Sequence, residues 1–326
     1  MSAGRALTVE VLLDEGDLRA TMRAEVAEGL TATPKWISPV WFYDEEGSRL
    51  FEEITQLEEY YPTRTERALL TAHAGNIASL AAADTLVELG AGALEKSRLL
   101  LDAMVAEGRL RRYVPFDVSE TFLVAAAGEL SAEYQELEVV AVVGDFHRHL
   151  DLVPAGGNRL IAFLGGTIGN LIPAERRVFF DQVRAMIGPG DSFLIGTDLV
   201  KDRARIVAAY NDAAGITAEF NRNALRVLNA RLGADFVPEH FEHVALWNEA
   251  ECWIEMRLRS TCDQVVRVAD LELEVSFAEG EELLTEISAK FTPEGIAAEL
   301  ASAGLRVRET YGRAEGQFLL SFATTD

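Results

Sequence analysis

The amino-acid sequence predicts an α/β protein with a doubly wound, mostly parallel sheet and a second, α+β domain. Between residues 84 and 197, short apolar segments alternate with segments of helical periodicity. Glycines follow the first apolar segment, and after residue 198 the alternation gives way to longer helical stretches and antiparallel strands. Because parallel neighbours need crossover connections, which are usually helices, this alternation indicates a parallel sheet covered by helices on both faces.

Five apolar runs bounded by turn residues predict the buried strands of this sheet, over 84–89, 112–116, 138–143, 159–164 and 192–197. Three stretches between them predict its helices, over 95–106, 119–130 and 173–187. The first of these helices carries Leu99, Leu100 and Met104 as its apolar residues. Ahead of the first strand, Thr63 and Glu66 have the spacing of a capping box, which predicts that a helix begins there and continues through residue 80.

The rest of the chain predicts the second domain and the end of the first. The first sixty residues look mostly helical, 201–232 is rich in helix, and 241–275 has the pattern of antiparallel strands. A helix capped by Thr292 and a strand pair over 305–311 and 317–323 complete the sheet. We therefore predict a cofactor-binding core of residues 65–200 plus 290–326 and a substrate-binding domain of residues 1–64 plus 201–289.

Composition and charge exclude several functions. With 49% hydrophobic and 25% charged residues, the 326-residue chain can bury a large core. Its net charge of −23 repels phosphate backbones and anionic lipids, so we expect neither nucleic acid nor membrane as a partner. Two cysteines and an N-terminus without a signal-peptide core favour the cytoplasm, and the five histidines match no metal-site motif. We expect a monomer without a metal.

Glycine and acidic residues stand where the predicted strands end. Gly90 and Gly92 follow the first strand, where glycine allows a tight turn and a close approach of the backbone to a ligand. Asp117 ends the second strand and can accept hydrogen bonds from both hydroxyls of a ribose. After the third strand, Asp145 can accept from an exocyclic amine and Phe146 can cover an adenine ring.

Together these residues predict an adenosine pocket without a pyrophosphate cradle, and we expect its ligand to be S-adenosylmethionine. Glu95 occupies the third small-residue position of the dinucleotide fingerprint, which argues against a nicotinamide cofactor. Taken singly, Asp117 could cap a helix and Asp145 could be a turn former. Their joint placement after successive strands favours the binding interpretation.

Long segments of the chain resemble the histidine Nα-methyltransferases of ergothioneine biosynthesis, over residues 35–66, 86–104, 163–173, 196–202, 208–223 and 281–291. The resemblance extends from about residue 20 to the end of the chain. It implies a Rossmann-like class I methyltransferase fold. It also implies a reaction in which three molecules of S-adenosylmethionine trimethylate the α-amino group of L-histidine to hercynine.

The resemblance also implies roles for single residues. The residues that would hold the cofactor are Gly90, Lys96, Asp117, Asp145 and Phe146. The catalytic residues at the reacting amine would be Asn170, which also contacts the carboxylate, and Tyr43. The other substrate-binding residues would be Tyr210 at the carboxylate, Tyr60, Glu286 and Ser288 at the imidazole, and Met256 lining the same pocket. Since Asn170 and Tyr43 are weak bases, we assign no general base.

For Glu286 and Ser288, the strand pattern and the family resemblance favour different interpretations. If residues 284–291 are extended, both side chains point to one face, where a carboxylate can accept the imidazole N–H and a hydroxyl can meet the other nitrogen. The alternation alone favours a half-exposed strand whose polar face reads Glu-x-Ser-x-Lys. The family resemblance reverses that preference.

Three positions depart from the family pattern. Ala91 and Ala93 stand where serine and threonine are usual, and Gly166 stands where serine is usual, which removes hydroxyls near the cofactor. These losses leave the hydrogen bonding of the cofactor open. Competing functions are a methyltransferase for another amino acid or small amine, a nicotinamide-dependent oxidoreductase, and a non-catalytic cofactor-binding module.

Overall fold

The chain folds into two compact units, each assembled from discontinuous segments. The computed structural model describes residues 7–13, 15–92, 94–146, 148–313 and 316–325. Residues 1–13, 62–200 and 291–326 form one unit, here named the core unit. Residues 14–61 and 201–290 form the other, here named the insertion unit.

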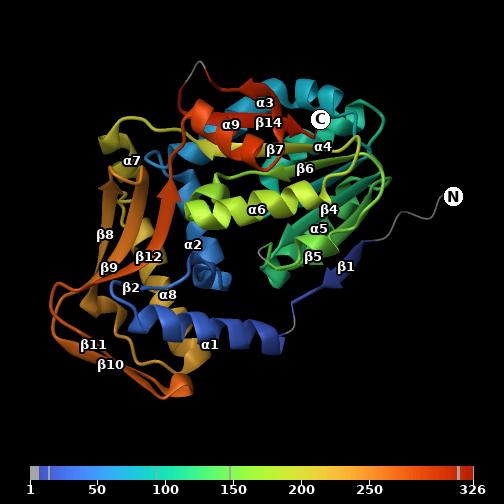
Figure 1. Ribbon diagram of the computed structural model, residues 1–326. Coiled ribbons are helices and arrows are strands. Elements are labelled where there is room, and N and C mark those ends of the chain that lie inside the picture. The colour runs from blue at the N-terminus through green and yellow to red at the C-terminus, as the bar shows by residue number, and fades with distance from the viewer. Residues whose placement is uncertain (1–6, 14, 93, 147, 314–315, 326) are drawn as a thin grey trace. The chain divides into compact units, whose positions relative to one another are not determined.

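The core unit is built on a large sheet. Its strands are β1 (Thr8–Val11), β3 (Thr85–Leu89), β4 (Arg112–Asp117), β5 (Glu138–Val143), β6 (Arg159–Phe163), β7 (Ser192–Asp198), β13 (Arg306–Tyr311) and β14 (Phe318–Thr324). They lie in the order β1-β5-β4-β3-β6-β7-β14-β13 (Figure 1). In this order, every neighbouring pair from β1 across the sheet to β7 is parallel. Strand β14 is antiparallel to β7, and β13 is antiparallel to β14. The predicted doubly wound, mostly parallel sheet is confirmed, and its order reverses between β3 and β6, where such sheets bind ligands.

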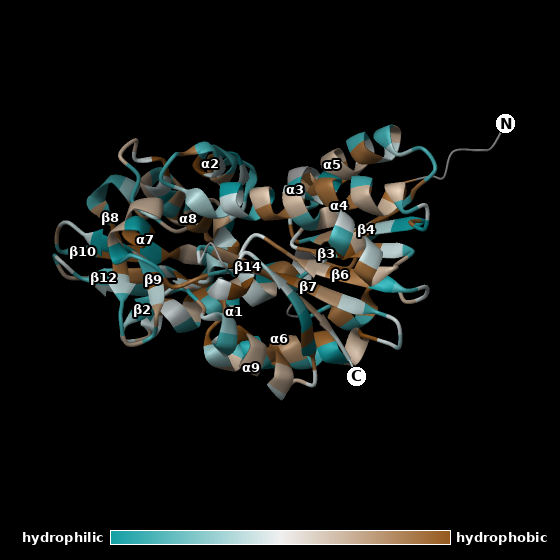
Figure 2. Cartoon of the chain, turned by 90° about the horizontal axis from the view of Figure 1, so that it is seen from above, coloured by the Kyte–Doolittle hydropathy of each residue, from teal (hydrophilic) through white to brown (hydrophobic). Residues whose placement is uncertain are grey.

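Helices cover both faces of this sheet. The helices of the core unit are α3 (Tyr61–Ala81), α4 (Glu95–Ala106), α5 (Glu120–Glu133), α6 (Pro173–Met186) and α9 (Pro293–Ser302). Figure 2 shows α3, α4 and α5 on one face and α6 and α9 on the other. Helix α4 and strand β5 have the bounds that the sequence predicted, because long apolar periodicity and short β-branched runs are the strongest local signals.

Helix α3 begins earlier than the sequence analysis predicted. Its first residue is Tyr61, and Pro62 stands in its first turn, a position where proline suits the helix geometry. Thr63 is therefore already inside the helix and cannot be its N-cap, so the predicted capping box was wrong. Glu66 is thereby free of a capping role, and its carboxylate binds other parts of the core unit instead.

Strand β1 divides the N-terminal stretch. Residues 8–11 pair in parallel with residues 140–143 of β5 and extend the sheet of the core unit by one edge strand. The prediction that residues 1–64 all belong to the substrate-binding domain does not include this pairing. The residues of β1 are all exposed, so the segment lacks the continuous apolar pattern that indicates a buried strand. An edge strand needs only one neighbour and can therefore form from such a sequence.

The insertion unit combines a smaller sheet with helices. Its strands are β2 (Lys35–Trp36), β8 (Phe241–Asn248), β9 (Trp253–Ser260) and β12 (Glu282–Ala289), in the order β2-β12-β9-β8. A separate hairpin pairs β10 (Gln264–Val268) with β11 (Leu273–Phe277). The helices of this unit are α1 (Glu15–Thr31), α2 (Glu45–Gln56), α7 (Arg203–Ala209) and α8 (Ile216–Leu232). The predicted antiparallel strands are present, and β10 and β2 are additions that the sequence analysis did not single out.

Helix α8 forms the centre of the insertion unit. It packs against α2, against the short 3-10 helix η1 (Pro39–Phe42), and against β8 and β9. Its buried side chains include Phe220, Leu225 and Leu228, each of which stabilises the fold by roughly 1.5–3 kcal/mol relative to an exposed position. Gly233 ends the helix in the left-handed region, at φ +60°. This rigid helix supports one wall of the pocket described next.

Candidate active site

A small pocket in the insertion unit gathers residues from α2, α7, α8, β9 and β12. Its lining residues are Phe51, Ile54, Tyr60, Ala209, Tyr210, Thr217, Phe220, Met256 and Glu286. Most of these side chains are apolar or aromatic, and Glu286 is the one acid among them. An apolar cavity with a few convergent polar groups is typical of a binding site for a small molecule.

Glu286 reaches this pocket because β12 contains a β-bulge. Leu284 lies opposite Arg257 of β9, whereas Glu286 lies opposite Met256. In a regular strand, residues two apart share a face, so Glu286 would lie on the face of Leu284 and Arg257. The extra residue is Thr285, whose Oγ1 donates to the carbonyl oxygen of Met256 at 2.9 Å. The bulge therefore moves Glu286 to the face of Met256.

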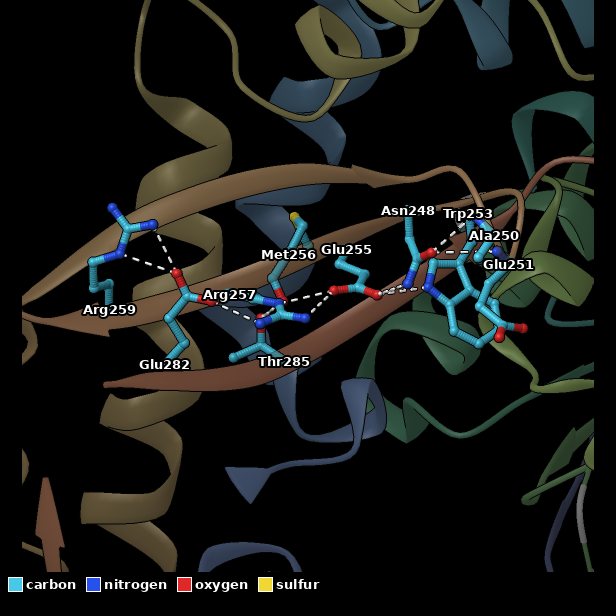
Figure 3. A network of polar contacts seen from close by, with 10 residues as sticks. All are labelled: Asn248, Ala250, Glu251, Trp253, Glu255, Met256, Arg257, Arg259, Glu282 and Thr285. Carbon is cyan, nitrogen blue, oxygen red and sulfur yellow. Dashed lines mark hydrogen bonds and ion pairs between the residues drawn. The ribbon is translucent and has the colours of Figure 1, made fainter. Parts of the chain in front are cut away.

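The opposite face of the same sheet carries a ladder of ion pairs (Figure 3). Glu282 accepts from Arg257 and from Arg259, at 2.7 Å in both cases, and Arg257 also binds Glu255. Met256 stands between Glu255 and Arg257 in β9, so its side chain points to the pocket face. Partly exposed pairs of this kind contribute about 0–1 kcal/mol each. The ladder connects β9 and β12 across the face that is opposite the pocket.

A larger cavity, of about 360 Å³, borders this ladder, but its charged lining residues are paired with one another. Its charged lining residues are Lys35, Arg257, Glu281 and Glu282. Lys35 is paired with Glu281 and Arg257 with Glu282, so these charges neutralise one another. We therefore take the smaller pocket around Glu286 as the candidate site.

The carboxyl group of Glu286 is the unusual polar group of that pocket. The residue is 8% exposed, and within the described part of the chain no donor forms a hydrogen bond to it. Burial raises the pKa of Glu286 to about 8, and the ammonium of Lys290 opposes this rise. Because a buried carboxyl group without a partner costs free energy, its presence points to a ligand that supplies the donor.

Tyr210 and Ser288 form a second polar group beside Glu286. The hydroxyl of Tyr210, directly after α7, donates to Ser288 Oγ at 2.9 Å. Lys290 Nζ donates to Tyr210 Oη at 3.0 Å and to Ser288 Oγ at 2.9 Å. All three residues are buried. Glu286, Ser288 and Lys290 are spaced two apart at the end of β12, so beyond the bulge they share one face.

Aromatic rings enclose these polar groups. The ring of Tyr60 lies edge-on to the rings of Tyr210 and Phe51, with centroids 6.2 and 6.1 Å away. Tyr43 packs against Phe51 at 5.8 Å and Phe220 at 5.6 Å. Since Phe51 and Phe220 line the pocket, Tyr43 belongs to the same aromatic cluster without lining the pocket itself. A flat heteroaromatic ring is well suited to such surroundings.

His243 fixes the backbone of Tyr210. Its Nε2 lies 2.8 Å from the carbonyl oxygen of Tyr210, and its Nδ1 lies 2.9 Å from the amide nitrogen of Asn221. Because an amide nitrogen only donates, Nδ1 is the acceptor, and Nε2 carries the hydrogen that the carbonyl of Tyr210 receives. Burial lowers the pKa of His243, so the ring stays neutral and this arrangement persists at neutral pH.

The raised pKa of Glu286 predicts how stability depends on pH. The ordinary pKa of this side chain is 4.5, and in the folded protein it is about 8. Between these values the folded state keeps a proton that the unfolded chain has released, so the free energy of unfolding falls as the pH rises. The full loss is on the order of 5 kcal/mol.

Glu286→Gln removes this titration while keeping the size of the side chain. We expect the variant to gain stability relative to the original protein as the pH rises from about 5 to about 9. Urea unfolding of both proteins at three pH values measures the difference between their free energies of unfolding. The titration of all other groups cancels in this difference. Parallel stability curves would contradict the prediction.

The glycine turn of the core unit lies at the carboxyl end of β3. Gly90 and Gly92 have φ angles of +66° and +55°, in the left-handed region that favours glycine. The N–H groups of Gly90 and Ala91 donate to the carbonyl of Phe116 at 2.8 and 3.1 Å, which ties the turn to β4. A Cβ added at Gly92 would meet nothing within 4 Å, so the turn leaves space for a ligand.

Asp117 binds to the same turn. Its Oδ2 accepts from the backbone N–H of Gly92 and its Oδ1 from that of Ser119, both at 3.0 Å. Ser119, not Asp117, is the N-cap of α5. Burial raises the pKa of Asp117, and the backbone N–H groups oppose the rise. Each carboxylate oxygen retains a lone pair, which suits the two hydroxyls of a ribose.

An aromatic side chain and an acid follow β5, the strand next to β4. Phe146 is half-buried, and its ring lies 5.5 Å from that of Phe163 and 5.8 Å from that of Phe179. The backbone N–H of Asp145 donates to His149 Nδ1 at 3.1 Å, which holds this turn. The two residues therefore lie at the same edge of the sheet as Asp117, as an adenosine pocket requires.

Glu66, which the sequence pattern indicated only as part of a capping box, belongs to this region. It is 1% exposed, and its two carboxylate oxygens lie 2.9 and 3.0 Å from the backbone nitrogen of Gly165, which donates. It also pairs with Lys96 Nζ at 2.5 Å. A Cβ at Gly196 would lie 2.2 Å from Glu66 Oε1, so the carboxylate requires glycine there. Glu66 thus connects α3, the start of α4 and the loop after β6.

Glu66→Gln should destabilise the protein by about 3 kcal/mol, because it leaves Lys96 without its buried counter-charge. Chemical denaturation measures the loss. The control is Glu133→Gln, which breaks an exposed ion pair with Arg98 and should change stability by less than about 1 kcal/mol. Similar losses in the two variants would show that the buried pair has no special weight.

Asn170 ends the 3-10 helix η3 (Thr167–Asn170), which follows β6 in the core unit. Gly165 and Gly166 precede it with φ angles of +82° and +72°. Glycine at position 166, where the family pattern has serine, adopts this left-handed conformation without strain. Ala93, another departure from that pattern, lies outside the described residues.

In the described ranges, no three histidine, cysteine, aspartate or glutamate side chains form a group able to hold a metal ion. Likewise, none of the helices within those ranges is long and apolar enough to span a bilayer. Cys252 and Cys262 are both free thiols.

The site residues thus belong to two groups, one in each unit. The core unit contains Gly90, Lys96, Asp117, Asp145, Phe146 and Asn170, and the insertion unit contains Tyr43, Tyr60, Tyr210, Met256, Glu286 and Ser288. Sequence reasoning missed Glu66 and Lys290. The alternating pattern Glu-x-Ser-x-Lys could have indicated that Lys290 shares a face with Glu286 and Ser288. For Glu66, the spacing from Thr63 indicated a capping role, and no sequence pattern indicated a role in the site.

Comparison with known proteins gives a consistent result. Residues 22–325 match the profile of a family described as histidine-specific, SAM-dependent methyltransferases. The chain is 55% identical over 302 residues to the histidine N-alpha-methyltransferase of Mycolicibacterium smegmatis, covering 93% of this chain and 94% of that protein. It is 52% identical over 310 residues to the Mycobacterium tuberculosis protein of the same name, covering 95% and 96%. Ergothioneine biosynthesis protein 1 of Neurospora crassa is 36% identical over 205 residues, which are 61% of this chain and 23% of that protein.

Proposed function

Since this chain belongs to the family of histidine-specific, S-adenosylmethionine-dependent methyltransferases, we propose that the pocket around Glu286 binds the imidazole ring of L-histidine. The enzyme is a histidine Nα-methyltransferase, which trimethylates the α-amino group to hercynine in ergothioneine biosynthesis. The observation that carries the assignment of the pocket is the buried carboxyl group of Glu286, enclosed by aromatic rings and without a protein donor among the described residues.

The imidazole ring needs an acceptor for its N–H and a donor for its other nitrogen. The Glu286 carboxylate is the acceptor and the Ser288 hydroxyl is the donor in this proposal. Tyr60 and Met256 enclose the ring, and Tyr210 binds the carboxylate of the substrate. A substrate amino acid with a phenyl or aliphatic side chain would leave the Glu286 carboxyl group without a hydrogen-bond donor. The unpaired group costs about 1–3 kcal/mol or more of binding free energy, which selects against such amino acids.

The α-amino group of a free amino acid is largely protonated at neutral pH, so each transfer requires that a proton leaves first. Asn170 Oδ1 and the Tyr43 oxygen can orient the ammonium and then the amine. Neither is a strong base, so the proton passes to water or to a polar neighbour. The trimethylated nitrogen has no lone pair, so the reaction stops at that product.

The core unit would hold the methyl donor. S-Adenosylmethionine supplies an activated methyl group on sulfonium, and the protein supplies alignment and proximity. Asp117 would bind the ribose hydroxyls, Asp145 and Phe146 the adenine, and Gly90 would allow the close approach of the backbone. Lys96 would complete the set, and its pairing with Glu66 supports a fixed position for its ammonium group.

The direct test is mass spectrometry of L-histidine incubated with the enzyme and S-adenosylmethionine. The expected product is heavier than histidine by three methylene units, and mono- and dimethylated species precede it. A parallel panel of other amino acids distinguishes a histidine enzyme from a methyltransferase for another amine. If histidine yields no methylated product, the proposed function fails.

We also expect the enzyme to act as a monomer in the cytoplasm, with L-histidine as its small-molecule partner. The acidic charge of −23 and the two free cysteines support this expectation. Light scattering of the purified protein across a concentration series tests the oligomeric state.

A further inference from the structure

Glu66 is a buried acid of the core unit, next to the loop that follows β6. Its side chain belongs to α3 and is 1% exposed. Both carboxylate oxygens accept from the backbone N–H of Gly165, at 2.9 and 3.0 Å, and Oε2 also accepts from Lys96 Nζ at 2.5 Å. A backbone N–H and an ammonium group as donors suit an ionised carboxylate, so this buried position carries a negative charge.

Lys96 connects Glu66 to the cofactor site proposed above. It stands in the first turn of α4, the helix that follows the glycine turn. A Cβ added at Gly165 would lie 3.3 Å from Lys96 Nζ, so the ammonium group lies against this loop. Its side chain is 24% exposed, and Glu66 takes one of its three donors, so Lys96 can also bind the methionyl carboxylate of the cofactor. Glu66 is then one ion pair away from the methionyl end.

The methyl donor and the product of methyl transfer differ in charge. S-Adenosylmethionine carries a positive charge on sulfur, whereas S-adenosylhomocysteine is neutral there, because the electron pair of the broken S–CH3 bond stays on sulfur. The carboxylate and ammonium groups of the two molecules are the same. A buried carboxylate interacts with the sulfonium through surroundings of low dielectric constant and is screened little by salt. Glu66 should therefore stabilise the bound donor more than the bound product.

Glu88 in β3 is a second buried acid of this region. Burial raises the pKa of Glu88, which favours its protonated form. Its carboxyl group accepts from the hydroxyl of Tyr113 at 2.7 Å. Glu66, which has an ammonium group as its partner, is therefore the acid here that supplies a negative charge.

We infer that Glu66 is a specificity-determining residue, through which the enzyme binds the cationic methyl donor in preference to its neutral product. This inference rests on the proposed function, in which the core unit holds the cofactor with Lys96 at the methionyl end. Trimethylation requires three donor molecules for each histidine, so the product must be exchanged for the donor between transfers. A fixed negative charge that favours the donor limits inhibition by the product.

The test is isothermal titration calorimetry of Glu66→Gln and the original enzyme, in the absence of histidine. The quantity measured is the Kd for S-adenosylhomocysteine divided by the Kd for S-adenosylmethionine. Glutamine keeps the shape of the side chain and removes its charge, so this ratio should fall by about fivefold. Changes of the loop or of Lys96 act on the groups that the two ligands share and therefore cancel in the ratio. Sinefungin, which carries an ammonium group in place of the methylated sulfur, should lose its preference over S-adenosylhomocysteine to a similar extent.

Two further variants serve as controls. Glu66→Gln combined with Lys96→Met removes one charge of each sign and should return the ratio to within about twofold of the original. Glu133→Gln removes an exposed, ion-paired carboxylate of the same unit and should leave the ratio unchanged. If Glu66→Gln alone does not fold, Lys96→Met is compared with the double variant. These two proteins differ only in the charge at position 66, so the same fall in the ratio is expected.

An unchanged ratio, with both ligands weakened equally, overturns the inference and leaves Glu66 a purely structural role. A fall that occurs with S-adenosylmethionine but not with sinefungin also overturns it, because contacts of the methyl group rather than the positive charge would then be responsible. Failure of the original enzyme to bind S-adenosylmethionine is a separate result that overturns the proposed function.

Discussion

Glu286→Ala should lower kcat/KM for histidine by about 100-fold while the affinity for S-adenosylhomocysteine stays within about twofold. The variant removes the acceptor for the imidazole N–H and leaves that donor unpaired in an apolar pocket, which costs about 1–3 kcal/mol and more for a charged partner. The effect should appear mainly in KM, because the imidazole is remote from the reacting nitrogen and is held in the ground state as well as in the transition state.

Glu282→Ala is the matched control for this prediction. It removes the same kind of side chain from the same strand, but on the face of the ion-pair ladder. Glu282 lies before the bulge and Glu286 after it, so the two variants differ in which face of the sheet they change. Equal losses of histidine turnover in the two variants would show that strand β12, rather than the carboxyl group in the pocket, is what the reaction needs.

Asp117→Ala should weaken binding of S-adenosylhomocysteine by about 100-fold or more. Two hydrogen bonds from ribose hydroxyls to a charged acceptor contribute roughly 1.5–3 kcal/mol each. The substitution also releases the N–H groups of Gly92 and Ser119, which the carboxylate now holds. Because the turn of Gly92 would lose one of its ties to the end of β4, part of the loss comes from a less ordered turn.

Isothermal titration calorimetry of the cofactor product measures this loss. The control is Asp102→Ala on α4, where the carboxylate accepts a hydrogen bond from the exposed Tyr134 hydroxyl outside the glycine turn. We expect no change in affinity for that variant. Unaltered affinity in Asp117→Ala would remove Asp117 from the cofactor site and would leave it as a residue that only orders the turn.

The strands and helices of the core unit could be predicted from the sequence because the patterns that indicate them are local. Continuous apolar runs bounded by turn residues and helical segments with a period of 3.6 determine β3, α4 and β5 without reference to the rest of the chain. Gly90 and Asp117 could be located for the same reason, since the carboxyl end of each strand follows from its length. Strand β1 escaped because an exposed edge strand leaves no periodic trace in the sequence.

The residues proposed to bind the imidazole were identified from the family resemblance, and their geometry depends on tertiary structure. The alternation of Glu286, Ser288 and Lys290 places them on one face, but it does not say which face. That choice is made by the bulge at Thr285, which shifts the register between Leu284 and Glu286. A shift of one residue turns every later side chain to the other side of the sheet, and no local propensity encodes it.

The sequence by itself therefore determined the α/β architecture, the strands and helices of its core, and which residues follow the ends of those strands, because hydrophobic periodicity and glycine turns are properties of neighbouring residues. Tertiary structure alone decided that Glu286 lies buried with no hydrogen-bond donor among the described residues, that Lys290 donates to Tyr210 and Ser288, and that Glu66 binds Lys96. These properties depend on groups up to 80 residues apart in the chain, whose distances are set only when the sheets and helices pack.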